Sequence, residues 1–542
     1  VERVPSKPGL TAVELFDALA DGRVKMVWIA CTNPMQSMPD LTRVKAGLEA
    51  AQLVVLQDAY ANTETASFAD VVLPATSWGE KEGTVTNSER RISRVRAALP
   101  KPFEARHDWE IACDFGRRLG PSSLFPYDSP EAIWNEHREA TRGRDLDITG
   151  LSYAILDERG PQQWPFPEGA TQGKARLYED GVFATPNGRA RFYTEKHRDL
   201  AEGVDARFPL RLTTGRLRDH WHGLSRTGNV TPLFGHVAEP RLGMNAADMS
   251  RRALEPGELV AVKSRRGTVH VIVEADEGVR SGQAYLPMHW GKRFLGGRDS
   301  AGVNTVTSPA LDPLSRQPEL KHAAVKIERA GLPWRLTAFV RVDPERFVHV
   351  LDALLPLQSE LTFASAVPFG RATPGVLFRA AAEQSPSEAW LATLDRILEL
   401  EGDDVLRYDD PRLGHARRLK ISGDHLASAR LSGDAGAIAS GEWLREWLAS
   451  GQSVAEIRRA LLLPSALPPA GLVPASRIVC QCLGISEHAI AASLALLPDN
   501  AADRVKHLQA TLRCGTNCGS CLPELRALSA ALPVPVRKEQ AA

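Results

Sequence analysis

Four of the seven cysteines in this 542-residue chain form two tight pairs near the C-terminus, Cys480-x-Cys482 and Cys518-x-x-Cys521, and Cys514 lies between the pairs. Four thiolates from two short loops can hold an iron–sulfur cluster or a zinc ion, and oxidation would instead join them as disulfides. Structural zinc sites commonly use two Cys-x-x-Cys pairs, whereas a Cys-x-Cys pair suits a two-iron cluster whose irons each take two thiolates. We therefore expect an iron–sulfur cluster, which implies that the rest of the chain supplies or consumes electrons.

The segments around the two pairs predict how the sulfurs are delivered. A short strand over Ile478-Val479 would present both cysteines of the first pair on one side, because residues i and i+2 of an extended segment point the same way. The second pair lies in a glycine-rich turn that starts at Gly515 and leads into an expected helix, Leu522–Leu532. The positive end of that helix would stabilise thiolates and the anionic sulfides of a cluster.

Polar residues also follow three short apolar runs near the N-terminus. Residues 24–30, 53–56 and 70–74 are expected to be strands, a helix is expected over 10–20, and this alternation indicates a parallel sheet. Ligands of such sheets lie beyond the carboxyl ends of the strands. Those ends carry Thr32-Asn33-Pro34, Gln57-Asp58 and Pro74-Ala75-Thr76.

The segment Glu80–Arg91 is densely polar and directly follows the third apolar run. A solvated surface loop is the simpler interpretation. The alternative is a ligand-binding segment, because the strand delivers it to the ligand edge of the sheet. Gly83-Thr84 and Asn87 suit close backbone approach and hydrogen bonding to a phosphate or a base.

Residues 208–328 predict a β-barrel or a sandwich. Short strands are expected over 210–213 and 259–262, and the alternating run Thr268–Glu274 would pair with the latter through Arg265-Arg266-Gly267, where glycine permits a positive φ. The segment Thr213–His222 is rich in polar residues and contains a His-x-His pair. No carboxylate or thiol lies at a zinc-like spacing from that pair, so binding of a large polar ligand is favoured over a metal.

Residues 333–463 carry no recognisable chemical motif. A helix is expected to start at Ser385-Pro386-Ser387-Glu388. Ser385 would be the N-cap, Pro386 the first helical residue and Glu388 the glutamate of a capping box. A second helix is expected to open at Ser453–Glu456 and to end at Pro464. The Pro/Ala-rich stretch Pro464–Ser476 then predicts a linker.

Composition excludes two classes of protein. The 66 basic and 66 acidic residues cancel, so the basic excess of a nucleic-acid binder is missing. No apolar run is long enough to span a bilayer. The chain starts at Val1 without a signal-peptide pattern, and paired thiols suit a reducing compartment, so a cytoplasmic location is expected.

The cysteine-rich tail resembles the bacterioferritin-associated ferredoxin-like 2Fe–2S domain. The resemblance rests on Val479–Cys482, on the helix start Ile485-Ser486-Glu487 and on Cys514–Cys521. It implies that Cys480, Cys482, Cys518 and Cys521 are the cluster ligands and that Cys514 is spare.

The front of the chain, roughly residues 10–330, resembles the molybdopterin oxidoreductases of the dimethyl-sulfoxide-reductase superfamily. The resemblance rests on Cys31–Pro34, Gln57-Asp58, Asp70–Pro74, Glu80–Arg91, Gln163-Trp164-Pro165, Pro186–Ala190, Thr214–His222 and Asp312–Lys321. With its ferredoxin-like tail, the whole chain is similar to the assimilatory nitrate reductase catalytic subunits of bacteria.

The superfamily resemblance implies a molybdenum held by two molybdopterin guanine dinucleotides. In the first domain the nucleotide contacts would fall on Asn33, Gln57, Asp58, Lys81 and Asp108. In the barrel they would fall on Thr214, Gly215, Arg216, His220, Trp221, His222, Asn304 and Lys321. Cys31 and Cys113 are read as structural residues. No cysteine cluster precedes residue 31, so the chain looks like the later portion of a catalytic subunit, with a 4Fe–4S cluster and the protein ligand of molybdenum expected upstream.

The implied reaction is reduction of nitrate to nitrite, with electrons entering through the 2Fe–2S domain from a ferredoxin, a flavodoxin or an NADH-linked reductase. Another bis-molybdopterin enzyme, such as a formate dehydrogenase, is an alternative, because a fold does not fix a substrate. A non-catalytic electron carrier or docking module is a second alternative for the chain alone.

The expected fold is α/β and consists of consecutive parts. They are a Rossmann-like dinucleotide-binding domain (1–125), a connecting segment (126–207), a double-psi type β-barrel (208–330), a mixed α+β spacer or docking segment (331–463), a linker (464–476) and a small helical 2Fe–2S domain (477–542).

Overall fold

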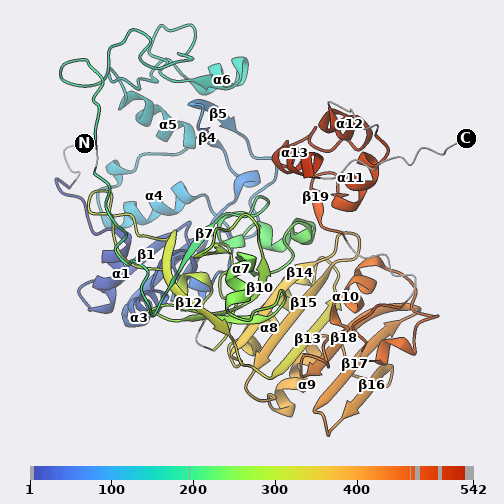
Figure 1. The fold of residues 1–542 in the computed structure, drawn as a ribbon. Coiled ribbons are helices and arrows are strands. Elements are labelled where there is room, and N and C mark those ends of the chain that lie inside the picture. Colours follow the sequence, from blue (N-terminus) through green and yellow to red (C-terminus); the bar gives the residue numbers. More distant parts are fainter. Residues whose placement is uncertain are drawn as a thin grey trace, which may run out of the picture. The chain divides into compact units, whose positions relative to one another are not determined.

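The computed structural model describes residues 5–194, 196–298, 300–463, 465–469, 476–497 and 503–531 (Figure 1). The chain forms two compact units. The first combines residues up to 23, residues 33–50 and residues from 201 onwards, and the second combines residues 24–32 and 51–200. No helix in these described ranges is long and apolar enough to cross a membrane.

The second unit contains the expected parallel sheet. Strands β1 (Met26–Ala30), β2 (Leu53–Asp58) and β3 (Val71–Pro74) lie in the order β1-β2-β3, and both pairings are parallel. The helices of this unit are α4 (Asp108–Leu119), α5 (Pro130–Glu139) and α6 (Tyr153–Arg159).

The polar segment 80–91 is mostly a hairpin and not a loop. Strand β4 (Gly83–Thr86) pairs antiparallel with β5 (Arg91–Val95), which pairs in turn with β6 (Gln162–Gln163). A surface strand can carry polar side chains, because its backbone N–H and C=O groups form hydrogen bonds with the neighbouring strand whatever the side chains are. Composition alone therefore made this segment look irregular.

The first unit begins with helices α1 (Ala12–Ala20), α2 (Pro34–Ser37) and α3 (Leu41–Ala50). A capping box of Thr11 and Glu14 starts α1. A Cβ atom at Gly47 of α3 would lie 2.8 Å from the carbonyl oxygen of Phe16, so the glycine allows α1 and α3 to pack closely.

A closed six-stranded barrel follows, which confirms the barrel of the two predicted alternatives. The order is β10-β8-β11-β7-β12-β9, with parallel pairs β8–β10 and β7–β11. The strands are β7 (Leu210–Gly215), β8 (Arg241–Met244), β9 (Leu259–Lys263), β10 (Thr268–Ala275), β11 (Gln283–Pro287) and β12 (His322–Arg329), and helix α7 spans Ala246–Arg251. Buried and partly exposed residues alternate along β10, as they must in a barrel whose lumen is filled with side chains.

Residues 334–433 form a six-stranded antiparallel sheet in the order β14-β15-β13-β18-β17-β16 (Figure 1). Its strands are β13 (Trp334–Arg341), β14 (Phe363–Phe369), β15 (Gly375–Ala382), β16 (Val405–Asp410), β17 (His415–Ser422) and β18 (His425–Gly433). Its helices are α8 (Phe347–Gln358), α9 (Glu388–Ile397) and α10 (Gly441–Ser450). All seven residues of β14 are buried, and one hydrophobic core includes both this sheet and the barrel.

Three local predictions are wrong in detail. Gly267 does not adopt a positive φ, and its small size instead accommodates Thr305, whose Cγ2 would lie 2.7 Å from an added Cβ. The N-cap of α9 is Ser387, which accepts from the backbone N–H of Trp390, so the preceding proline lies outside the helix. The helix expected from residue 453 is a series of turns that ends in a short 3-10 helix, Ala460–Leu462.

The C-terminal part is a small helical domain built on a short hairpin. Strands β19 (Ile478–Cys480) and β20 (Ile485–Ser486) precede helices α11 (Glu487–Leu494), α12 (Arg504–Thr511) and α13 (Leu522–Ala531) (Figure 1). The strand ends at Cys480, so Cys482 lies in a turn and not in the extended segment expected for it. The predicted linker 464–476 falls largely outside the described residues.

Candidate functional site

In the second unit, three predicted nucleotide contacts meet at one carboxylate. Asp108 is the first residue of α4, and its oxygens accept from Gln57 Nε2 at 2.8 Å and from Lys81 Nζ at 3.0 Å. Gln57 comes from the end of β2, and its own Oε1 accepts from Trp28 Nε1 at 3.2 Å. The tertiary structure thus gathers a carboxylate, an amide and an ammonium at the carboxyl end of the parallel strands.

The electrostatics of this group favour an ionised Asp108. Burial alone would raise the pKa of Asp108, but the hydrogen bonds from Gln57 and Lys81 outweigh it and hold the pKa below its usual range. The Sγ of Cys31 lies 3.6 Å from the same carboxylate, and burial followed by the Asp108 charge raises the pKa of this thiol. Cys31 therefore borders the candidate site.

The other two predicted contacts of the front domain accept hydrogen bonds from nearby backbone N–H groups. The Oδ1 of Asp58 accepts from the backbone N–H of Tyr60 at 3.0 Å, so its carboxylate is turned toward its own loop, and burial raises its pKa. Asn33 belongs to the first unit, where its carbonyl oxygen accepts from the N–H groups of Gln36 and Ser37 at the start of α2.

In the barrel, the predicted contacts cluster around the end of β7. A Cβ on Gly215 would lie 2.8 Å from the hydroxyl of Tyr285, so a larger residue there would have to displace the Tyr285 ring. Thr214 Oγ1 donates to the carbonyl oxygen of Leu320 at 2.7 Å, which ties this strand end to the segment that carries Lys321. Burial, and then the positive charges of Arg216 and Lys321, lowers the pKa of His222.

Several polar atoms in this region are buried without a hydrogen-bond partner in the described chain. They are His220 Nε2, His289 Nδ1 and Trp290 Nε1. Burial lowers the pKa of both His220 and His289 to about 4, so these rings are neutral at pH 7. An unpaired buried polar group costs free energy, so these atoms favour a polar ligand that would bond to them. His289 was not among the predicted contacts.

Of two further predicted barrel contacts, Trp221 is exposed and Asn304 is partly buried. Trp221 is half exposed, with the guanidinium carbon of Arg226 4.8 Å from its ring centroid. Asn304 Nδ2 donates to the carbonyl oxygen of Gln36 at 2.9 Å, and Gln36 Nε2 donates to the carbonyl oxygen of His289 at 3.2 Å. Gln36, which the sequence did not indicate, thus connects α2 to the barrel.

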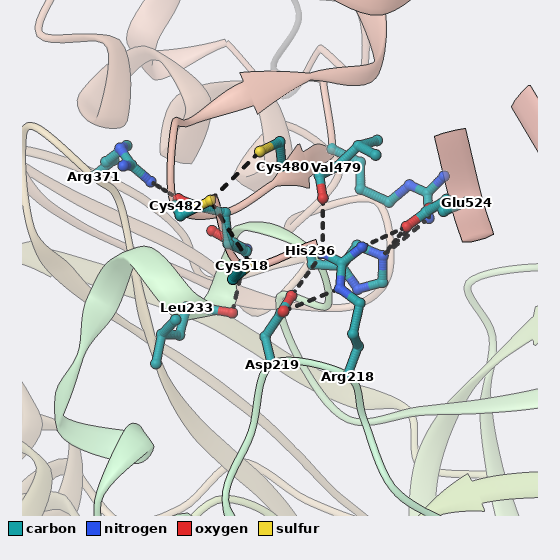
Figure 2. A network of polar contacts seen from close by, with 12 residues as sticks. Arg218, Asp219, Leu233, His236, Arg371, Val479, Cys480, Cys482, Cys518 and Glu524 are labelled. Atoms are coloured by element: carbon teal, nitrogen blue, oxygen red, sulfur yellow. Dashed lines mark hydrogen bonds and ion pairs between the residues drawn. The ribbon is translucent and has the colours of Figure 1, made fainter. Parts of the chain in front are cut away.

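The four predicted cluster ligands lie together in the C-terminal domain (Figure 2 shows three of them). The Sγ atoms of Cys480 and Cys482 are 3.7 Å apart, and those of Cys482 and Cys518 are 3.8 Å apart. Burial raises the pKa of the Cys521 thiol, and Cys480 lies close enough for its thiolate charge to raise that pKa further. Two thiolates on one tetrahedral metal, each about 2.3 Å from it, would lie about 3.7 Å apart.

The sulfurs form a row of neighbours, because Cys482 lies close to both Cys480 and Cys518. No group of three or more His, Cys, Asp or Glu side chains in the described ranges is arranged as ligands of a single ion. All seven cysteines are free thiols, so the disulfide alternative is not what the structure shows. Neighbouring cysteine thiols are the ligand set that a 2Fe–2S cluster needs, so these residues fit such a cluster.

Cys514 is more buried than Cys482 and Cys518, two of the predicted ligands. Its side chain is completely buried in the small core of the domain, and its Sγ lies 3.5 Å from the carbonyl oxygen of Leu508 as a donor. By contrast, Cys482 and Cys518 are exposed. This agrees with a packing role for Cys514.

Comparisons with known proteins match three parts of the chain. Family models match residues 2–118 as "Molybdopterin oxidoreductase", residues 210–324 as "Molydopterin dinucleotide binding domain" and residues 478–530 as a BFD-like 2Fe-2S binding domain. The matched ranges contain the parallel sheet, most of the barrel and the four cysteines, respectively.

Curated relatives match over part or nearly all of the chain. A nitrate reductase from Klebsiella oxytoca is 34% identical over 540 residues, which are 98% of this chain and 58% of that protein. A nitrate reductase from Synechocystis is 43% identical over 60% of this chain and 46% of that protein. The F420-dependent formate dehydrogenase subunit alpha of Methanocaldococcus jannaschii is 37% identical over 59% of this chain and 45% of that protein. The chain thus spans about half the length of the curated relatives it matches.

Among solved structures, the acetylene hydratase from Pelobacter acetylenicus matches with a TM-score of 0.47 and 19% identity, over 58% of this chain and 46% of that chain.

Proposed function

We propose that this chain is a molybdopterin oxidoreductase and that it acts as the catalytic subunit of an assimilatory nitrate reductase. The observation that carries the proposal is the K. oxytoca nitrate reductase, which aligns over 98% of the chain and so includes the cysteine domain. The formate dehydrogenase aligns over only 59%.

We infer that two groups of residues hold the molybdopterin dinucleotides. Gln57, Lys81 and Asp108 would bind one nucleotide end, with Lys81 neutralising phosphate and Asp108 accepting from hydroxyl or N–H groups. The remaining contacts proposed for this end are Asn33 and Asp58. The parallel sheet would be of the Rossmann type, and the barrel of the double-psi type.

The barrel group would bind the other nucleotide end. Arg216 and Lys321 supply positive charge, and the unpaired nitrogen of His220 offers a hydrogen bond. Thr214, Gly215, Trp221, His222 and Asn304 complete the proposed contacts. Bound molybdenum supplies the oxygen-atom chemistry that turns nitrate, two electrons and two protons into nitrite and water.

The proposed role of the C-terminal domain is electron entry. Its four cysteines hold the cluster, and the exposed Cys482 and Cys518 mark the side on which a ferredoxin, a flavodoxin or an NADH-linked reductase would approach. A cytoplasmic location stays a prediction, as do the domain boundaries outside the matched ranges.

The test uses the enzyme expressed from its complete gene in a host that makes the cofactor. We expect nitrite formation from nitrate with a reduced viologen dye. Formate oxidation without nitrite formation would instead favour the formate dehydrogenase alternative. The 37% identity to such an enzyme is the reason to test it. A protein that carries iron but neither molybdenum nor guanine nucleotide would favour the carrier alternative.

The nucleotide contacts are tested separately by cofactor content. Arg216→Gln combined with Lys321→Gln should lower the guanine nucleotide released on acid hydrolysis several-fold, because two cations that face phosphate are lost. Arg251→Gln is the matched control, since Arg251 pairs with Asp248 at 2.5 Å on helix α7. Equal nucleotide content in the double variant and the control would contradict the assignment.

A further inference from the structure

The cluster-binding loop is held by two arginines that come from other parts of the fold. Arg218 lies in the loop after β7 of the barrel, and its Nη2 donates to the carbonyl oxygen of Val479 at 2.8 Å (Figure 2). Arg371 lies in the turn between β14 and β15 of the six-stranded sheet, and its Nη1 donates to the carbonyl oxygen of Gln481 at 3.0 Å. These two carbonyl groups directly precede the ligands Cys480 and Cys482.

Arg218 is also the centre of an ion network that fixes the domain. Its Nη1 donates to Glu524 at 2.7 Å, and Asp219 accepts from the other side of the same guanidinium at 2.8 and 3.0 Å. Glu524 lies in the first turn of α13 and also pairs with His236 at 3.0 Å and with Arg477 at 2.5 Å. The side chain of Arg218 is only 19% exposed, so its charge is poorly screened by water.

Small residues allow this close contact on both sides of the loop. A Cβ on Gly484 would lie 3.0 Å from Nε of Arg371, so glycine lets the guanidinium rest against the loop. A Cβ on Gly235 would lie 2.9 Å from Ile478, so glycine lets the barrel segment approach the strand that carries Cys480. The loop therefore contacts both the barrel, through Arg218, and the six-stranded sheet, through Arg371.

We propose that Arg218 and Arg371 form an arginine clamp on residues 478–484, which holds the 2Fe–2S domain in one docked position and raises the reduction potential of its cluster. The potential of such a cluster depends on nearby charge, hydrogen bonding and solvent exposure. Each arginine places a positive charge at the peptide next to a ligand, and positive charge favours the form with one more electron. Asp219 and Glu524 offset part of the charge of Arg218. The clamp also gives residues 331–463 a function, namely the docking of the electron-transfer domain.

This inference goes beyond the proposed reaction and rests only on the cluster ligands, so it is tested without turnover. The midpoint of the reduced-cluster signal is followed by electron paramagnetic resonance during a redox titration of the full chain. Arg218→Gln and Arg371→Gln should each lower the equilibrium constant for cluster reduction by up to tenfold, which is about 59 mV for one electron. Iron and sulfide content, measured first, show whether each variant holds its cluster.

Conservative and control variants separate charge from packing. Arg371→Lys should keep the midpoint near that of the parent, because it keeps the charge. Arg346→Gln is the matched control, since Arg346 lies in the same segment and pairs with Glu399 at 2.6 Å. Hydrogen exchange of residues 478–486 should rise in both glutamine variants and stay unchanged in the control.

Unchanged midpoints in both glutamine variants, relative to Arg346→Gln, would overturn the proposal even if exchange rises. Arg218→Gln leaves Asp219 and Glu524 with fewer partners and could fail to fold. Arg371 is exposed, so its variants keep the test decisive in that case.

Discussion

Acidification should destabilise the barrel through two neutral, buried histidines. His220 is 7% exposed and His289 is fully buried, and burial lowers the pKa of each to about 4. In the unfolded chain the pKa of histidine is about 6.5. Between these values the unfolded state binds more protons than the folded state, so stability falls as the pH drops below about 6.5 and levels off near 4.

The size of the effect follows from those two pKa values. Between pH 7 and pH 5, one histidine with a pKa of about 4 in the folded state and about 6.5 in the unfolded state removes about 2 kcal/mol of unfolding free energy. The two histidines together are therefore worth up to about 4 kcal/mol over this interval. That is a large share of the stability of an ordinary domain.

The assay must report on the barrel alone, because a chain with several domains does not unfold in one step. Hydrogen exchange in increasing urea, corrected for the intrinsic effect of pH, gives the opening free energy of peptides from β11 and β12 at pH 7 and pH 5. In the parent this free energy should fall with acidification. In His289→Gln the fall should be smaller by about 2 kcal/mol.

The matched control is His197→Gln, because the side chain of His197 is 88% exposed. It should show the same pH dependence as the parent. The substitution at His289 also changes the stability at pH 7, since the ring accepts from the backbone N–H of Leu217 at 2.9 Å, so only the difference between the two pH values is compared. Equal differences in His289→Gln and the parent would refute the reasoning.

Two further pairs of variants test burial and ligation. Glu239 and Glu442 both pair with Arg379, but their side chains are 4% and 52% exposed. Glu239→Gln should therefore lower the opening free energy of β15 peptides, measured by hydrogen exchange in urea, by about 3 kcal/mol, and Glu442→Gln by less than about 1 kcal/mol. Equal losses would contradict this. Cys514→Ala should keep its iron and lose about 1 kcal/mol of stability, whereas Cys482→Ala should lose the visible absorbance of the cluster. Loss of iron in Cys514→Ala alone would reverse the ligand assignment.

Much of the fold could be predicted from the sequence because its signals are local. Apolar runs separated by helical stretches indicated the parallel sheet, and the structure pairs β1, β2 and β3 in parallel. The spacing of Cys480 and Cys482 indicated neighbouring sulfurs, and their Sγ atoms are 3.7 Å apart. Hydrophobic periodicity and cysteine spacing are set by a few neighbouring residues. Both can therefore be recognised without knowing how the rest of the chain folds.

Local signals were misleading where packing or backbone pairing decides the outcome. The polar segment 80–91 looked like a loop, yet it forms most of a hairpin with β5. Gly267 looked like a turn residue with a positive φ, yet it is small because Thr305 packs against it. Neither the partner strand nor the packed side chain can be read from the segment itself.

The sequence by itself determined which residue types are available for cofactor binding, namely the paired cysteines and the polar segments at strand ends. Only the tertiary structure decided which of them meet. Arg218 and Glu524 are 306 positions apart and yet form an ion pair at 2.7 Å beside the cysteine ligands. Such contacts depend on how the barrel, the six-stranded sheet and the helical domain pack, because packing brings together residues whose spacing along the chain carries no signal.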